Sequence, residues 1–358
     1  MAKFTDIFED VTKQGTKIPT NLYLENGLYP IIDQGQSEIA GYTNQTEGLF
    51  SEIPAIIFGD HTRIIKYVDT PCFLGADGVK LLKAKDNNAN YKYLYYALCH
   101  ADIPNTGYNR HFKWLKEIDI PEYPVEEQNS IVAQLEKIDI LIYLRKQQLS
   151  KLDELVKSRF IELFGNIDDC ENKLELQDIC IKITDGSHNP PAGIEKSANY
   201  MISSQNIHDN IIDYKDVRYL SDSDFVIENK RTAIEIGDVL LTIVGAIGRS
   251  AVVKDDLNIT CQRSVCVIHP NRDKVNSIFL KYMLDNISDK IINEARGAAQ
   301  KGIYLNQVKK LQIICPSFEL QNAFAAFVEQ TDKSKLAIQQ SLEKLETLKK
   351  ALMQKYFG

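Results

Sequence analysis

Two long stretches of the chain have the hydrophobic spacing of helices. Neither Val125–Phe164 nor Ser317–Phe357 contains a glycine or a proline, and both are rich in charged residues. Apolar residues recur in each at intervals of three and four, as on one face of a helix. They are Leu135, Ile138, Ile142, Leu149, Leu152, Val156 and Leu163 in the first stretch, and Val328, Ile338, Leu342, Leu345, Leu352 and Tyr356 in the second. The pattern predicts two helices of roughly forty residues, each about 60 Å long.

Polar residues interrupt both apolar faces. Arg145 and Arg159 fall on the first face, and Thr331, Lys335 and Lys349 fall on the second. Sustained spacing of this kind favours a coiled coil. The simplest partner for each helix is the other helix, in antiparallel orientation. In the alternative interpretation, each helix covers only the domain beside it.

The two helical stretches are copies of one another. Gln128–Gly165 aligns with Gln321–Gly358 without a gap, so that Gly165 falls on Gly358 at a constant offset of 193 residues. Both copies begin with Gln-Asn and end with Phe-Gly. A unit that occurs only twice is not a solenoid, which needs three or more repeats. The sequence therefore predicts a duplicated unit made of one domain and one helix.

The regions that precede the helices agree more weakly. Tyr93–Leu98 matches Phe279–Leu284 at an offset of 186 residues. We predict an α/β (α+β) fold with two globular domains, two long antiparallel helices and an internal pseudo-twofold repeat. The predicted boundaries are 1–124 for the first domain, 125–165 for the first helix, 166–315 for the second domain and 316–358 for the second helix.

Composition places the chain among ordinary globular proteins, because 44% of its 358 residues are hydrophobic and 25% are charged. It has no apolar run of about eighteen residues and no signal peptide, so we expect a cytoplasmic protein without a membrane segment. The seven cysteines form no CxxC pair, and we expect no metal site.

The net charge of −7 argues against a protein that holds nucleic acid through bulk charge alone. This net charge is compatible with local basic surfaces. Any affinity for DNA would then be completed by a partner that contributes more phosphate contacts.

Polar loops between apolar segments are the candidates for reading bases, because Arg, Lys, Asn, Gln, Ser and Thr can bond to base edges in the major groove. In the first domain the candidates are Gln36, Tyr42, Thr43, Asn44, His61, Thr62, Arg63, Tyr108, Asn109, Arg110, His111 and Lys113. In the second domain they are Ser187, His188, Ser204, Gln205, Asn206, Arg249, Gln262, Arg263, Gln300 and Lys301. The alternative for each is a turn or cap residue without a ligand.

Arginine in a loop rich in glycine or asparagine can reach either guanine or phosphate. The favoured readers are therefore Arg63, Arg110, Arg249 and Arg263, whereas Lys113 and Lys301 are expected to contact phosphate. Gly35 and Gly186 would supply turn geometry.

Three motifs suggest catalysis but lack essential parts. Asn189–Ala192 is similar to the Asn-Pro-Pro-aromatic loop of amino-methyltransferases, yet Ala192 replaces the aromatic residue that stacks on a flipped base. Asp224, Glu228 and Lys230 imitate a nuclease set, but such clusters are common on surfaces. Gly245 and Gly248 are not followed by Gly-Lys-Ser/Thr, so they predict close strand packing rather than a phosphate loop.

The only tryptophan, Trp114, lies beside Leu115 and is predicted to be a core residue rather than a base-stacking residue. We expect no catalytic residue in this chain.

The order of these features resembles the specificity subunit of type I restriction-modification enzymes, over the whole chain. The segments that carry the resemblance are Pro124–Gln128, Pro316–Gln321, the terminal Phe-Gly of each helix, Ser204–Ile207, Gly237–Leu240 and Thr242–Arg249. The first domain departs from it, since Phe58–Arg63 stands where the second domain has its Gly-x-x-Gly-Arg segment.

The resemblance implies two target-recognition domains that each read one half of a split asymmetric site in double-stranded DNA, with the helices as spacer. It further implies a subunit that is not an enzyme. Two methyltransferase subunits that carry S-adenosylmethionine would dock on it, and optionally two restriction subunits that use ATP and Mg²⁺. This chain itself would bind no cofactor.

Two other classes of function stay open at this point. One is a self-contained DNA methylase or nuclease, which would itself bind S-adenosylmethionine or Mg²⁺. The other is a coiled-coil scaffold without a DNA role.

Overall fold

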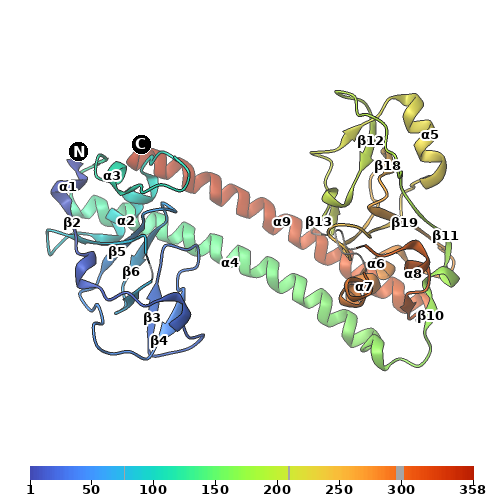
Figure 1. The fold of residues 1–358 in the computed structure, drawn as a ribbon, viewed down its shortest axis with the longest axis horizontal. Coiled ribbons are helices and arrows are strands. Elements are labelled where there is room, and N and C mark those ends of the chain that lie inside the picture. Colours follow the sequence, from blue (N-terminus) through green and yellow to red (C-terminus); the bar gives the residue numbers. More distant parts are fainter. Residues whose placement is uncertain (76, 209, 296–301) are drawn as a thin grey trace. The chain divides into compact units, whose positions relative to one another are not determined.

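The computed structural model describes residues 1–75, 77–208, 210–295 and 302–358. The chain forms two compact units: unit 1 contains Met1–Gln148 and Ile338–Gly358, and unit 2 contains Leu149–Ala337. Each unit has one domain of strands and short helices and one part of each long helix (Figure 1). The long helices are α4 (Val125–Phe164) and α9 (Phe318–Phe357), as the hydrophobic spacing predicts.

Unit 1 contains two main sheets. The four-stranded antiparallel sheet has the order β2-β8-β5-β6, and its central strand β5 is buried along its whole length. The three-stranded sheet has the order β4-β3-β7, in which β3 pairs antiparallel with β4 and parallel with β7. The strands are β2 (Phe8–Asp10), β3 (Tyr29–Ile32), β4 (Gly41–Thr43), β5 (Ala55–Gly59), β6 (Ile65–Val68), β7 (Phe73–Leu74) and β8 (Val79–Ala84).

Unit 2 repeats this topology. Its four-stranded antiparallel sheet has the order β11-β19-β16-β17, and its three-stranded sheet has the order β15-β12-β18 with one antiparallel and one parallel pair. The strands are β11 (Cys180–Asp185), β12 (Asn199–Ile202), β15 (Arg218–Tyr219), β16 (Val239–Thr242), β17 (Ser250–Val252), β18 (Asn258–Cys261) and β19 (Val265–Pro270). The α/β class and the internal repeat are confirmed.

Short antiparallel strand pairs complete both domains. β1 (Ala2–Lys3) pairs with β9 (Asp119–Ile120), and β10 (Leu174–Glu175) pairs with β20 (Gln312–Ile313). Unit 2 also has a hairpin of β13 (Ile207–His208) and β14 (Ile211–Ile212), which forms a sheet of its own. The shorter α-helices are α1 (Phe4–Ile7), α2 (Tyr91–His100), α3 (Phe112–Leu115), α5 (Asp222–Thr232), α6 (Ser277–Asn286), α7 (Ser288–Glu294) and α8 (Leu305–Lys309).

The long helices run antiparallel within each unit. In unit 1, Lys349 pairs with Asp139 at 2.5 Å and Glu346 pairs with Lys146 at 3.3 Å, so residue numbers fall on α9 as they rise on α4. In unit 2, Lys335 pairs with Asp153 at 2.5 Å. The predicted apolar positions are all buried or half-buried. Two of the polar interruptions, Lys335 and Lys349, are the lysines that pair with a carboxylate of the opposite helix.

The shared Gln-Asn that opens both copies has a structural role. Asn90 caps α2 by accepting a hydrogen bond from the Tyr93 backbone N–H, and its Nδ2 donates to Asn129 Oδ1 at 2.8 Å. In unit 2, Asn276 caps α6 and its Nδ2 donates to Asn322 Oδ1 at 3.0 Å. These bonds connect α2 to α4 and α6 to α9 in the same way.

The glutamine of each Gln-Asn pair and the phenylalanine of each terminal Phe-Gly also make equivalent contacts in the two units. Gln128 and Gln321 each donate through Nε2 to a backbone carbonyl five residues earlier, at 2.9 Å. Phe164 packs on Phe279 of α6 at 4.9 Å between ring centroids, and Phe357 packs on Tyr93 of α2 at 5.3 Å. The repeated residues therefore join each domain to a helix.

No described helix combines the length and the apolar character needed to cross a membrane.

Candidate nucleic-acid interface

Two equivalent hairpin loops each present an arginine. The loop between β5 and β6 contains Arg63, and the loop between β16 and β17 contains Arg249. These two residues are separated by the same 186 positions as α2 and α6. Each guanidinium donates to a backbone carbonyl, Arg63 to Ile103 O at 3.1 Å and Arg249 to Ile207 O at 3.5 Å. Although the sequence of the first loop departs from that of the second, the hairpin is retained.

Three of the predicted loops meet in unit 1. The backbone N–H of His61 donates to Gln34 Oε1 at 3.1 Å, and the Thr62 hydroxyl donates to Gln34 O at 2.7 Å. The His61 ring bonds through Nδ1 to Asn109 O at 3.2 Å. The loop with Gln34 and Gln36, the loop from Asp60 to Arg63 and the loop from Tyr108 to His111 therefore form one surface.

The last of these loops exposes an aromatic ring. Tyr108 is 86% exposed and stacks on His61, with ring centroids 4.5 Å apart and planes inclined by 8°. Asn109 closes the loop by donating through Nδ2 to Thr106 O at 2.5 Å. Arg110 and Lys113 are exposed beside it. This surface offers stacking area and positive charge.

Trp114 is half-buried against the core of unit 1, as predicted. The Lys113 ammonium lies 4.1 Å from the centroid of its ring.

The remaining candidates of unit 1 lie on or after β4, at the edge of the three-stranded sheet. Asn44 Oδ1 accepts from the Leu28 backbone N–H at 3.1 Å, and the buried Thr43 hydroxyl accepts from the Gln45 N–H at 3.2 Å. Tyr42 is half-buried. Within the described part of the chain, the hydrogen bonds of these residues are made to neighbouring segments and not to the loops around His61.

Three candidate segments also come together in unit 2. The Ser187 N–H donates to Cys261 O and the Arg263 N–H donates to Ser187 O, both at 2.9 Å. The Gln262 N–H donates to Ile202 O at 2.9 Å, and the Ser204 N–H donates to Ser264 Oγ at 3.1 Å. The exposed side chains at this place are His188, Gln205 and Arg263.

Several candidates are used inside the protein. His111 is fully buried and bonds through Nδ1 to Asp60 O at 2.9 Å. Asn206 is buried, and its Nδ2 donates to Asp213 O and Asp216 O at 3.1 and 3.3 Å. Ser204 is also buried. For these three residues the structure favours the alternative role in turns and caps. Gln300 and Lys301 lie outside the described residues.

The glycines have other roles than the sequence suggested. Gly245 and Gly248 have φ angles of 83° and 87°, so they supply left-handed turn geometry and not close strand packing. Gly186, for which the sequence suggested turn geometry, instead permits close packing, because a Cβ atom there would lie 2.0 Å from the Cys261 carbonyl oxygen.

Two charged residues that make buried or half-buried ion pairs, Arg231 and Lys281, were not singled out from the sequence. Arg231 of α5 pairs with the buried carboxylate of Asp185, which also accepts from His188 Nε2 at 2.8 Å. Nothing in the charged sequence of α5 marks Arg231. Lys281 of α6 is buried, and its position inside the apolar run Phe279–Leu284 was a detectable signal.

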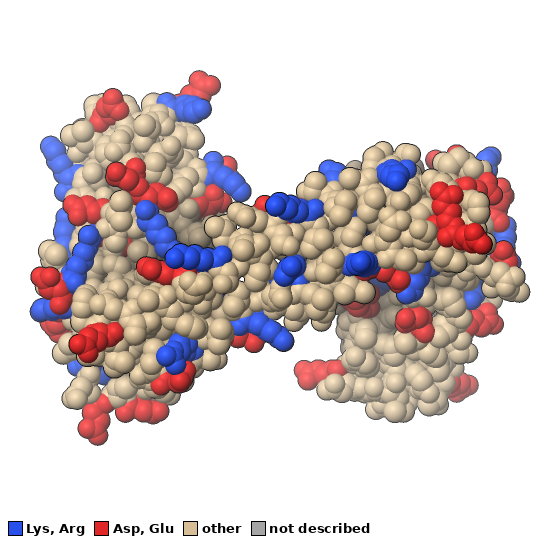
Figure 2. All heavy atoms as spheres, turned by 180° about the vertical axis from the view of Figure 1, so that it is seen from behind, with Lys and Arg blue, Asp and Glu red and all other residues tan. Residues whose placement is uncertain are grey.

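Acidic and basic side chains are interspersed over the face shown in Figure 2. Within the described ranges, no group of three or more His, Cys, Asp or Glu residues is placed to hold a metal ion. In the loop that is similar to a methyltransferase motif, Pro191 O accepts from Arg218 NH1 at 2.8 Å. Asp224 accepts from the Ser221 hydroxyl at 2.7 Å at the start of α5.

The duplicated domain and helix define a class of protein that comparison with known families identifies. The sequence model described as "Type I restriction modification DNA specificity domain" matches residues 1–154 and 176–349. The chain therefore belongs to this family.

Individual relatives agree with this assignment. The chain is 25% identical over 235 residues to the type I restriction enzyme EcoBI specificity subunit of Escherichia coli, which covers 64% of this chain and 47% of that protein. It is 31% identical over 127 residues to the EcoR124I/EcoR124II specificity subunit of Escherichia coli, covering 33% of this chain and 31% of that protein. The matches thus span about half of these relatives or less.

The fold is similar to that of a solved type I restriction-modification S subunit from M. genitalium. The TM-score is 0.63 at 16% sequence identity, and the match covers 99% of this chain and 95% of the other.

Proposed function

We propose that the chain is the DNA-recognition subunit of a type I restriction-modification complex and that each unit reads one half of a split, asymmetric site in double-stranded DNA. The observation that carries the proposal is the pair of equivalent hairpins with Arg63 and Arg249. The scaffold around the two hairpins is the same, whereas the residues that precede the arginines differ. A common scaffold with different loops suits two readings of different base sequences.

The described contacts support a division of labour at each surface. Exposed arginines such as Arg249, Arg110 and Arg263 can bond to guanine in the major groove, and Lys113 can contact phosphate. The exposed ring of Tyr108 adds a stacking surface. Backbone groups of the clustered loops are bonded to one another, so the loops are held in place before DNA arrives.

Partners would supply the chemistry. Two methyltransferase subunits that bind S-adenosylmethionine would dock on the subunit, and restriction subunits with ATP and Mg²⁺ would join where they exist. A net charge of −7 fits a subunit whose phosphate contacts are shared with such partners. The chain would then be non-catalytic.

The test is base-modification sequencing of genomic DNA from cells that make the chain with its neighbouring methyltransferase, against cells that lack only this chain. We expect a split motif, methylated on both strands and lost with the chain. Unchanged methylation by an active methyltransferase would refute the proposal and leave the scaffold function.

Two variants sharpen this test. Arg63→Ala should relax the sequence preference at one base position in one half of the motif, and Arg249→Ala should relax it at one position in the other half. Each variant should lose about 1–3 kcal/mol of discrimination against the wrong base. If both variants relaxed the same half, the assignment of one half to each unit would be wrong. Binding of S-adenosylmethionine to the isolated chain would instead indicate a self-contained methylase.

A further inference from the structure

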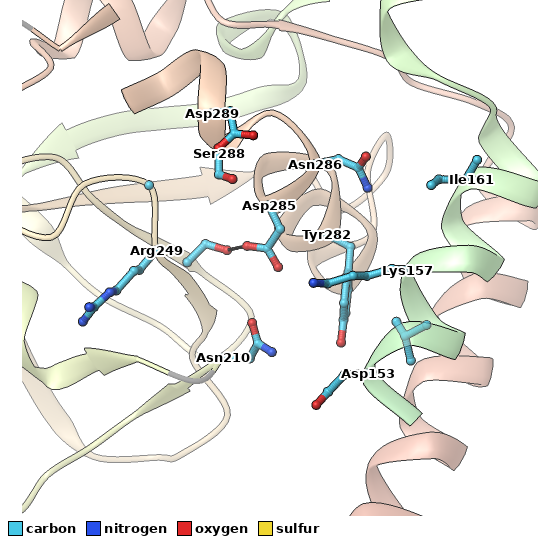
Figure 3. A pocket seen from close by; sticks show the side chains of 13 residues that line it. Asp153, Lys157, Ile161, Asn210, Arg249, Tyr282, Asp285, Asn286, Ser288 and Asp289 are labelled. Carbon is cyan, nitrogen blue, oxygen red and sulfur yellow. Dashed lines mark hydrogen bonds between the residues drawn. The ribbon is translucent and has the colours of Figure 1, made fainter. Parts of the chain in front are cut away.

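Lys281 is a buried lysine at the centre of a polar network in unit 2. Only 3% of the residue is exposed, and its Nζ lies 2.6 Å from Asp285 Oδ2, one helical turn along α6. Nζ also donates to Asn210 Oδ1 and lies 4.0 Å from the centroid of the Tyr282 ring. The network lies beside a pocket lined by Asn210, Tyr282 and Asp285 (Figure 3).

The network reaches the strand that follows Arg249. Ser250 is the first residue of β17, and its hydroxyl donates to Asp285 Oδ1 at 2.5 Å. The two oxygens of Asp285 therefore hold Lys281 on one side and β17 on the other. In Figure 3 the Arg249 side chain points away from Asp285. The Arg249 guanidinium is thus directed to the carbonyl of Ile207 in the β13–β14 hairpin and not to Asp285, while the Arg249 backbone is restrained by the next residue.

The network also reaches the β13–β14 hairpin. Asn210 precedes β14 and has a φ angle of 66°, a left-handed conformation. The hairpin has two residues in each strand and forms a separate sheet, although it contacts β17. Ile207 of the hairpin belongs to a buried apolar cluster that includes Ala251 of β17, and side-chain bonds add further restraints on its orientation. Arg249 NH1 and Lys281 Nζ supply two such bonds, to Ile207 O and Asn210 Oδ1.

Stability alone does not explain a charge at this position. A buried ion pair is weak evidence for stability, because the cost of removing both charges from water offsets their attraction. Unit 1 has Tyr95 at the equivalent position, 186 residues earlier, where it packs against Tyr67 and Tyr96. The scaffold therefore accepts an aromatic residue there, and the lysine is a feature of unit 2.

We propose that Lys281 is a positioning residue that fixes the β13–β14 hairpin relative to the strand of Arg249 and thereby sets the sequence preference at the half-site that unit 2 reads. This inference rests on the proposed function, because it assumes that unit 2 reads DNA. Lys281 itself, being buried, touches no DNA.

Three variants of the full chain separate positioning from general stability. Lys281→Met removes the charge and keeps an unbranched side chain. Asn210→Gly removes the acceptor of the hairpin but keeps a residue that adopts positive φ readily. Lys157→Met is the matched control, since Lys157 is an exposed lysine that lines the same pocket from α4.

The first readout is amide hydrogen exchange of the hairpin and does not require DNA. Because a hydrogen bond to a charged group is lost, Lys281→Met and Asn210→Gly should speed exchange in peptides that contain Ile207–Ile212 by about tenfold or more. Lys157→Met should leave these peptides unchanged. Unchanged exchange in Asn210→Gly would overturn the positioning role, even if Lys281→Met failed to fold.

The second readout is the methylation motif in cells with the neighbouring methyltransferase. Lys281→Met and Asn210→Gly should relax sequence preference at the same base positions as Arg249→Ala. A correct base pair is typically preferred over a wrong one by about 10- to 100-fold, and this preference should fall by about tenfold. The other half of the motif should stay intact. Relaxation of both halves together, or an unchanged motif, would overturn the inference.

A wild-type chain that directs no split motif would refute the proposed function instead. The hydrogen-exchange result would in that case still decide whether Lys281 positions the hairpin.

Discussion

Replacement of Phe160 by alanine tests how firmly α4 is built into unit 2. Phe160 is fully buried and has three aromatic neighbours: Phe164, Phe324 and Phe279, at centroid distances of 4.9, 5.4 and 5.9 Å. They come from α4, α9 and α6, so three helices meet at this ring.

The expected loss follows from the cavity. Truncation of a buried phenylalanine typically costs about 3–5 kcal/mol of unfolding free energy. Aromatic pairs contribute about 0.5–1.5 kcal/mol beyond burial, and rings held by three helices cannot collapse into the space. We therefore expect a loss in the upper half of that range, about 4–5 kcal/mol. Ile161→Ala is the matched control, because Ile161 is adjacent, 54% exposed and should change stability by less than about 0.5 kcal/mol.

Urea unfolding measured by far-UV circular dichroism gives the free energy, and hydrogen exchange locates the loss. Exchange should become faster in α6 of unit 2. Fluorescence of Trp114, the only tryptophan, reports on unit 1 and should change less. A loss below about 1 kcal/mol for Phe160→Ala, or an equal effect on α2 and α6, would refute the reasoning.

Three further predictions concern charge and packing. The side chains of Asp139 and Lys349 are each about one-third exposed, so a double-mutant cycle should give a coupling free energy of only about 0.2–1 kcal/mol. The exchanged pair, Asp139→Lys with Lys349→Asp, should recover most of this coupling free energy. A coupling above about 3 kcal/mol would contradict the prediction. Gly186→Ala should cost about 1–3 kcal/mol by urea unfolding, because the new Cβ meets the Cys261 carbonyl, and a neutral effect would show that the strand moves freely. Burial lowers the pKa of Lys281 below its ordinary 10.5, so the unfolded state binds more protons between the two pKa values and stability should rise with pH in that window. The difference in unfolding free energy between wild type and Lys281→Met should therefore shift in favour of wild type as the pH rises toward 10.5, and a shift in the opposite direction would be inconsistent with this.

The long helices could be predicted from the sequence because their signal is local and repeated. The spacing of Leu135, Ile138 and Ile142 continues over the whole of α4, and the gapless repeat fixes the same assignment for α9. The role of the shared Gln-Asn could not be predicted. Its partners Asn90 and Asn276 lie far away in sequence, and only the folded chain brings them together.

The candidate site was predictable only as a set of loops. A short polar residue such as Asn206 or Ser204 satisfies a turn as readily as it reads a base, and the choice depends on burial. Strands of two or three residues, such as β7 and β4, give no periodicity to detect. The function of Lys281 depends on a hairpin 71 residues away, so its neighbours in sequence do not indicate it.

The short strand pairs at the base of each domain have a genetic consequence. Ala2 lies opposite Ile120 in β1–β9, and Leu174 lies opposite Ile313 in β10–β20, so each domain is entered and left by the chain at one place. A foreign domain that ended in the same pair of strands could be inserted without altering the helices. If each domain reads one half-site, as proposed above, such an exchange would alter one half of the recognised sequence in a single step, without the slow accumulation of loop mutations.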